Sequence, residues 1–262
     1  MGKINTEFDH IKDTNQIKEL SVVLYPDSFF YGLWDTDDQL VRVGNSDLSR
    51  LSDLLRDINN DFDLTIARVM STSKPYVHIP GPYFEEEGFD SYFSGIYPLR
   101  KVRYRESEVD RFVREDICTL HYMDSELLEL TSTFDFPFKT GHISTAMANY
   151  SFLIEKDTIS YISNNTLHIS SSKQGEFRFY NQFDCYHKED YLYFYMLAFN
   201  GLDISPSEEE IQLGGNINQS SALYQMLESY LPGIEMQNDF IISDTEHPRQ
   251  YYFDLYLCKS CV

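Results

Sequence analysis

The sequence predicts a mixed α/β fold that is built from two copies of one structural unit. In each half of the chain, three short strand-like runs joined by tight turns are followed by an amphipathic helix and one more strand. Hairpins followed by a crossover helix form a mixed sheet with helices packed on it. Two such layers commonly meet at a ligand cleft, so we expect two lobes with a cleft between them.

The first copy of the unit begins with apolar and polar residues in short alternating runs, which is typical of half-buried strands. We expect strands at residues 20–25, 29–34 and 40–43, a helix at about 48–58 and a strand at 64–69. Pro26 presets the backbone of the first turn. After the Ser46-Asp47 cap, leucines recur at helical spacing, so the helix lays an apolar stripe on the sheet.

The second copy repeats this order. We expect strands at residues 158–162, 167–171 and 177–181, a helix at about 190–199 and a strand at 210–213. Outside the two units, further strands are expected at 76–80, 102–104 and 117–122, a turn or short helix at 124–130, and helices at 143–154, 221–231 and 248–257. The predicted domains are a polar N-terminal arm at 1–18, a first lobe at 19–138 and a second lobe at 139–262, whose last helix can return to the first lobe.

The charge balance is strongly acidic. With 21 basic and 42 acidic residues the net charge is −21, which repels phosphate backbones and anionic membranes at long range. We therefore expect no nucleic-acid partner. The first residues lack the pattern of a signal peptide, no apolar run reaches membrane-spanning length, and the four cysteines are mostly scattered. These features predict a cytoplasmic protein with no membrane partner.

Two glycines, Gly214 and Gly215, end the last strand of the second copy and are followed by Asn216 and a helix that begins near Ser220. Glycine lets the backbone come close to a flat ligand or to another segment. Within a duplicated unit, this strand-Gly-Gly-helix segment resembles the adenosine-binding segment of the actin, sugar kinase and Hsp70 ATPase superfamily.

Four further segments narrow the resemblance: residues 76–80, 177–181, 190–199 and 257–258. They are similar to a bacterial family of uncharacterised proteins with an actin-like ATPase (ribonuclease H-like) fold, catalogued as a domain of unknown function (DUF3822). The resemblance covers nearly the whole chain. It implies that fold, and it implies no reaction because the family has no established activity.

The phosphate-binding turns of the superfamily have poor counterparts in this sequence. Such turns are glycine-rich, cradle phosphates with backbone N–H groups and work with carboxylates that hold Mg²⁺. The first turn here is Tyr25-Pro26-Asp27-Ser28-Phe29 and the second is Ser163-Asn164-Asn165-Thr166, neither with a glycine. A charge-assisted hydrogen bond contributes ~1.5–3 kcal/mol, so losing two donors costs ~3–6 kcal/mol, or roughly 10² to 10⁴ in affinity.

Some binding capacity remains at these turns, because both asparagines can adopt positive φ and Ser28 can donate a hydrogen bond. We therefore predict a degenerate nucleotide cleft without catalytic or metal-binding residues, in which ATP and Mg²⁺ are not expected as cofactors. Its residues are Asp27, Ser28, Asn164, Asn165, Gly214, Gly215 and Asn216.

Three other candidate sites are weaker or remain open. Cys258-x-x-Cys261 has metal-ligand spacing but no second pair of ligands nearby in the sequence. Residues 20–25 carry no carboxylate, which argues against the metal-dependent nuclease chemistry of related folds. The acidic, aromatic segment 83–93 either packs its rings into the first lobe or forms a partner patch of Phe84, Phe89, Tyr92 and Phe93.

Three functional hypotheses follow from these features. The first is a non-hydrolysing, degenerate actin-like ATPase that serves as a binding or scaffold protein for a protein partner. The second is an active ATPase or small-molecule kinase with non-standard phosphate loops, in which Asp27 or Asp35 holds the metal. The third is a partner-docking role for the aromatic segment.

Overall fold

The computed structural model describes residues 7–72, 74–94, 96–97, 107–112, 116–123, 136–154, 156–238, 240, 242 and 247–261. The strand predicted at 102–104 and the turn or helix predicted at 124–130 lie outside these residues.

The strands are β1 Phe8–Asp9, β2 Ile17–Leu24, β3 Ser28–Asp35, β4 Leu40–Asp47, β5 Ile66–Ser71, β6 Tyr76–Pro80, β7 Ser107–Arg111, β8 Ile117–Tyr122, β9 Phe138–His142, β10 Thr158–Ser163, β11 Thr166–Lys173, β12 Glu176–Asp184, β13 Ile211–Gly215 and β14 Ile234–Met236. The helices are α1 Leu51–Asp61, α2 Phe89–Ser94, α4 Ile143–Ile154, α5 Lys188–Leu202, α6 Ala222–Tyr230 and α7 Phe253–Cys261.

Two sheets contain the same arrangement of strands. The first sheet has the order β1-β4-β3-β2-β5-β9 and the second has the order β12-β11-β10-β13-β14. In each, two successive hairpins form an antiparallel meander, and the strand after the helix returns parallel to the first strand, as β5 to β2 and β13 to β10. The duplicated mixed α/β unit predicted from the sequence is confirmed.

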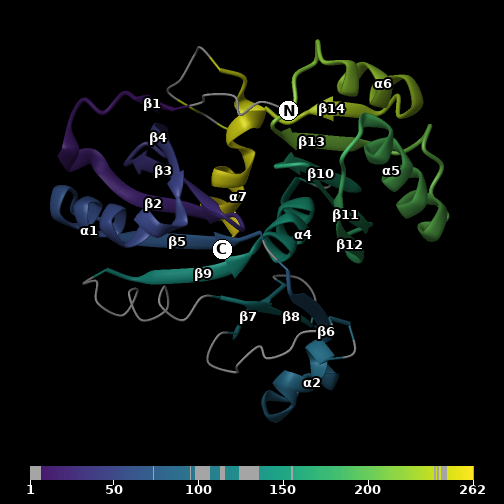
Figure 1. The fold of residues 1–262 in the computed structure, drawn as a ribbon, viewed down its shortest axis with the longest axis horizontal. Coiled ribbons are helices and arrows are strands. Elements are labelled where there is room, and N and C mark those ends of the chain that lie inside the picture. Colours follow the sequence, from purple (N-terminus) through teal and green to yellow (C-terminus); the bar gives the residue numbers. More distant parts are fainter. Residues whose placement is uncertain are drawn as a thin grey trace.

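A third, smaller sheet of order β6-β8-β7 lies beside the two large ones, with α2 next to it (Figure 1). β9, which starts at the predicted lobe boundary, pairs parallel with β5 and so belongs to the first sheet.

The N-terminal segment differs from the polar arm that we predicted for residues 1–18. In its described part, β1 pairs antiparallel with β4 and β2 already begins at Ile17. Arg42 donates to Asp9 at 2.7 Å, which joins the same two strands through side chains. A two-residue strand has no periodicity for sequence analysis to detect, and that is why this pairing was missed.

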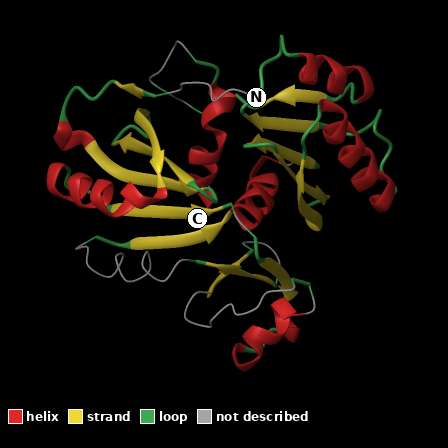
Figure 2. Cartoon of the chain, in the orientation of Figure 1, coloured by secondary structure: helices red, strands yellow, loops and turns green. Residues whose placement is uncertain are grey.

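The helices form an outer layer on each sheet and a central layer between the sheets (Figures 1 and 2). α1 covers the outer face of the first sheet, α5 and α6 cover the outer face of the second, and α4 and α7 pack against each other between them. α7 also packs on β2 of the first sheet. None of the described helices is long and apolar enough to span a membrane.

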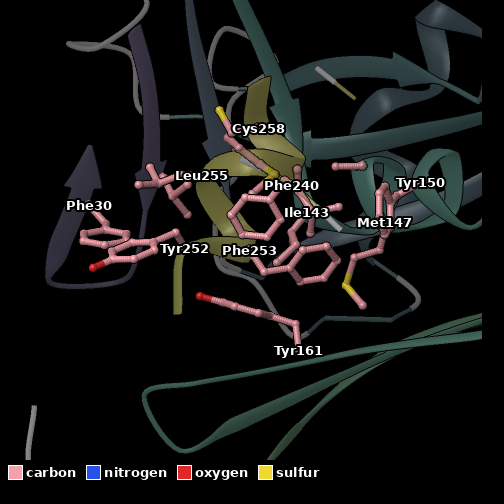
Figure 3. Packing of buried hydrophobic residues seen from close by; sticks show 14 of the residues in the cluster. Phe30, Ile143, Met147, Tyr150, Tyr161, Phe240, Tyr252, Phe253, Leu255 and Cys258 are labelled. Atoms are coloured by element: carbon pink, nitrogen blue, oxygen red, sulfur yellow. The ribbon is translucent and has the colours of Figure 1, made fainter. Parts of the chain in front are cut away.

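The central layer holds the core that joins the two units (Figure 3). Every residue of α4 from Ile143 to Phe152 is buried. Phe253 of α7 contacts Tyr150 of α4 edge-on and lies near Tyr161 of β10. Full burial of a large apolar side chain contributes about 1.5–3 kcal/mol, so this layer fixes how the two sheets face each other.

Candidate functional site

A pocket of about 840 Å³ opens where the three sheets meet, which is a usual size for a small-molecule site. The turn after β2, the turn after β10, the chain that leaves β5 and the end of β12 form its walls. Amides, hydroxyls and aromatic rings dominate the lining. The lining residues are Tyr25, Pro26, Asp27, Thr72, Lys74, Tyr122, Ile162, Ser163, Asn164, Asn165, Thr166, His168, Gln182, Asp184, Tyr191 and Asn216.

The first turn brings Asp27 to the pocket but offers few donors. Tyr25 N–H donates to the Ser28 carbonyl at 2.8 Å, and this bond closes the turn. Pro26 has no N–H. The Ser28 hydroxyl donates to Asp27 Oδ1 at 3.1 Å, and Ser28 lines an adjoining cavity of about 110 Å³ instead of the large pocket.

The second turn places two asparagines on the opposite wall. Asn164 and Asn165 have φ of 45° and 63°, so both are left-handed, as the sequence predicted they could be. A two-residue turn of this kind matches the twist of the strands that it joins. Both side chains are exposed and line the pocket, where their amides can donate to and accept from a neutral ligand.

The two glycines at the end of β13 line neither cavity. A Cβ added at Gly214 would lie 2.2 Å from the Phe253 ring, and one added at Gly215, which has φ of 103°, would lie 2.1 Å from the Ile162 carbonyl oxygen. The sequence left open whether the two glycines approach a flat ligand or another segment of the chain. The contacts fit close approach to another segment. Only Asn216, which follows them, reaches the pocket, and its N–H donates to Ile162 O at 2.8 Å.

Sequence analysis missed a buried oxygen cluster at the base of both turns. Tyr25 and Tyr161 are in hydrogen-bond contact at 2.6 Å; both phenols donate to Asp254 Oδ2, Tyr161 at 2.9 Å. Asp254 is 1% exposed, yet its carboxyl also lines the smaller cavity. The cluster thus joins the first sheet, the second sheet and the N-terminal end of α7.

The surroundings of Asp254 change the pKa of its carboxyl. Burial raises the pKa of Asp254 to about 6, even though both tyrosines donate to it, and burial also raises the pKa of Tyr25 and Tyr161 well above their usual value.

The charges around the large pocket do not suit a polyanion. Its lining has two carboxylates, Asp27 and Asp184, and one ammonium group, that of Lys74. Burial, with a smaller contribution from Lys74, lowers the pKa of His168 to about 3, so this histidine is neutral; its Nδ1 is 2.8 Å from the Tyr180 hydroxyl.

Metal ligands are also sparse around the pocket. Across the described parts of the chain, no group of three or more His, Cys, Asp or Glu side chains is arranged to hold a metal ion. Asp35, the other carboxylate that we considered for a metal, lies at the opposite end of β3 from Asp27, roughly 25 Å away along the strand. There it accepts from the N–H groups of Asp37 and Gln39, both at 2.9 Å. Asp35 is therefore excluded as a ligand of this pocket.

The predicted aromatic patch is largely turned inward. Phe93 is 3% exposed and packs with Ile79 and Leu120 of the small sheet, so it offers no docking surface. Phe84 and Tyr92 are half-buried and stack on each other with ring centroids 6.2 Å apart. The Phe89 side chain lies outside the described residues.

Comparison with protein families settles the relationship of the chain. The family described as "Protein of unknown function (DUF3822)" matches residues 7–234. The chain belongs to this family. Among curated proteins, none matches it in sequence.

Solved structures confirm the fold. A Bacteroides thetaiotaomicron protein with actin-like ATPase fold and unknown function is 17% identical over 98% of this chain and 99% of that chain, with a TM-score of 0.68. A chain of the PilM-PilN type IV pilus biogenesis complex is 9% identical over 93% of this chain and 98% of its own length, with a TM-score of 0.56. At these identities the likeness shows the fold alone, which is the predicted actin-like ATPase fold.

Proposed function

We propose that this DUF3822 protein is a degenerate actin-like ATPase that binds or scaffolds without hydrolysing ATP, and that it binds nucleotide weakly at most. The oxygen cluster of Tyr25, Tyr161 and Asp254 is the observation that carries the proposal. It lies at the base of both turns and lines the smaller cavity, so a phosphate group that entered this cavity would meet phenols and a carboxyl.

Electrostatics supports the same conclusion. The pocket lining sets one lysine against two aspartates, and the whole chain carries a net charge of −21. A nucleoside triphosphate with its several negative charges is repelled at long range by such a protein. Neutral hydrogen-bonding groups of a ligand are not repelled in this way, and the amides and hydroxyls of the lining can bond to them.

A protein partner is the second part of the proposal. The PilM-PilN structure shows a protein of this fold in a complex with another protein. The actin-like scaffold is thus compatible with a role in assembly, and we propose such a role for this chain. We also propose a cytoplasmic location, which is supported by the unpaired, buried thiols of Cys118, Cys185 and Cys258.

Phosphate release from Mg·ATP tests the absence of turnover. The purified protein should release no more phosphate than a protein-free blank. The Asp27→Ala variant, which removes the carboxylate of the first turn, is the matched comparison. Steady release by the wild type that this variant abolishes would contradict the proposal.

An active ATP-dependent enzyme is the alternative, and the observation in its favour is that Asp27 and Lys74 line one open pocket. Thermal unfolding with ATP, ADP and adenosine separates the two, because a ligand that binds the native state raises the unfolding temperature. Equal, small shifts for all three ligands support the binding protein. A large shift with ATP that requires Mg²⁺ supports the enzyme.

A further inference from the structure

Two equivalent helices differ on their outer faces. α1 and α5 are the crossover helices of the two units and cover the outer faces of the two sheets (Figure 1). The outer face of α1 is polar, with Ser52, Asp53, Arg56 and Asp57 exposed. α5 instead exposes Tyr193 and Leu197, at 61% and 48%. A helix that is apolar on all sides is expected to be covered on all sides, and no described residue of the chain covers the outer face of α5 at Tyr193 and Leu197.

The exposed residues of α5 form one stripe. Tyr193, Leu197 and Gly201 follow at intervals of four and therefore share a helix face; they span roughly 12 Å along the axis. Tyr186, 79% exposed, precedes the helix. Apart from the adjoining residues and backbone of α5 itself, no described part of the chain lies within 4 Å of a Cβ added at Gly201. We call these four residues the α5 stripe.

Acidic side chains flank the α5 stripe. Glu189 lies one turn before Tyr193, and its side chain is 68% exposed. Asp190 accepts the N–H groups of Tyr186 and His187, both at 2.8 Å, and these bonds lower its pKa, so it is ionised. Asp203, also exposed, caps the other end of the helix. One cation lies among these acids, because the Lys188 ammonium group is 3.8 Å from Glu189. The stripe therefore offers aromatic and aliphatic contact area between two ends that together carry three carboxylates and one ammonium group.

The charge decides which occupant fits. Two copies of this chain, each with a net charge of −21, repel each other, so a second copy is disfavoured as the cover. A segment with one apolar face and flanking Lys or Arg side chains complements both the rings and the carboxylates. Exposed tyrosines commonly anchor such contacts.

We propose that the α5 stripe is the docking surface for a cationic amphipathic segment of another protein. The apolar face of the segment packs on Tyr193 and Leu197, and its basic side chains pair with Glu189 and Asp190. This surface rests on the partner-binding role proposed above and gives that partner a chemical class. It lies on the outer face of the second sheet, and none of its four residues lines the pocket, which α5 reaches through Tyr191.

A synthetic peptide tests the proposal directly. The probe is a fluorescein-labelled, helix-forming peptide of leucine and lysine with a single apolar face, titrated with the full chain and followed by fluorescence anisotropy at about 0.15 M salt. The wild type should bind it. Tyr193→Ser combined with Leu197→Ser should weaken binding about tenfold or more, as truncation of anchor residues does.

A matched double variant controls for loss of exposed apolar side chains in general. Tyr83 and Leu153 are 74% and 64% exposed and lie outside α5, so Tyr83→Ser with Leu153→Ser should bind the peptide as the wild type does. Thermal unfolding of both double variants checks that they fold. Equal binding of the peptide by all three proteins would show attraction by net charge alone and would overturn the proposal.

Two more outcomes are decisive. A peptide in which glutamate replaces lysine should not bind, and if it binds as well as the lysine peptide the cationic class is wrong. Sedimentation should show a monomer, whereas a dimer that the Tyr193→Ser/Leu197→Ser variant abolishes would make a second copy the occupant. Phosphate release reports on the pocket, to which α5 contributes Tyr191 but no residue of the α5 stripe, so a failed proposal of non-hydrolysis is distinguishable from a failed docking surface.

Discussion

Helix α7 contacts an equivalent strand pair in each of the two units, but the two contacts use side chains of opposite size. At the first unit, Cys258 lies over β2 and β5, and its thiol donates to the carbonyls of Val22 and Arg68 at 3.6 and 3.5 Å. At the second, the Phe253 ring occupies the space that a side chain at Gly214 would fill.

At both contacts the side chains of the helix and of the strands together fill the available space. The residue types that fill it differ between the two units. A small side chain on the helix meets ordinary strand residues, whereas a large one needs a glycine. The glycines of β13 therefore give no independent sign of a ligand, although their place in the chain resembles a nucleotide-binding segment. Substitutions at Phe253, Gly214 and Cys258 test this view, and one at Asp254 tests the buried acid next to Phe253.

Phe253→Ala should have the largest effect. Removing a fully buried ring leaves a cavity between β13 and α4, and such substitutions cost about 3–5 kcal/mol of unfolding free energy. Urea denaturation followed by far-UV circular dichroism measures the loss. A cost below about 1 kcal/mol would mean that the central layer does not depend on this contact.

Asp254→Asn should change how stability depends on pH. The folded chain holds the Asp254 proton up to about pH 6, whereas an unfolded aspartate releases it near its ordinary value of 3.8. Because the folded state binds the extra proton, the stability from this group is complete below the unfolded pKa and is lost as pH rises through 6. The total is about 3 kcal/mol, at about 1.4 kcal/mol per pH unit.

Urea denaturation of the wild type and the Asp254→Asn variant at pH 5, 6 and 7.5 measures this difference. The wild type should lose stability relative to the variant between pH 5 and 6 and change little above that. Parallel profiles for the two proteins would show that burial does not raise the pKa of Asp254.

Gly214→Ala should cost about 1–3 kcal/mol, because the new methyl group overlaps the Phe253 ring. Combining it with Phe253→Ala sharpens the test, since the methyl group then enters the vacated space. The double variant should therefore lose less than the sum of the two single losses. Additive losses would show that the two positions do not share one volume.

Cys258→Ala should have the smallest effect, about 1 kcal/mol, because it removes one buried sulfur atom and leaves little space. The same urea measurement applies. A loss of unfolding free energy as large as that of Phe253→Ala would contradict the view that a small side chain at the first contact does the work of a large one at the second.

Local pattern was sufficient to predict most of the fold. β8 has the bounds predicted from its alternation, and the predicted strand at residues 158–162 is β10, one residue longer. α5 begins two residues earlier than predicted because Asp190 caps the helix start from inside its first turn. Periodicity marks the length of a helix better than its ends.

The candidate site was less predictable because it depends on contacts between distant positions. The turns could be located by their residue types, and four of the seven predicted residues, Asp27, Asn164, Asn165 and Asn216, line the large pocket. Tyr25 and Asp254 are 229 residues apart in the chain. The one local sign of the cluster is an acidic residue between apolar residues of a helix, in Phe253-Asp254-Leu255. The neighbouring sequence does not indicate which residues bond to this acid.

The junction between β9 and α4 limits how the pocket can respond to a ligand. β9 ends at His142 and α4 begins at Ile143, so no linker residue separates the first sheet from the buried central helix. Hinges use loop or element-terminal residues that can absorb changes of φ and ψ, and the terminal residues at this crossing, His142 and Ile143, are both fully buried. We therefore expect ligands to be selected by fit to a preformed opening, without the clamping motion that swings one half of a protein over its cargo.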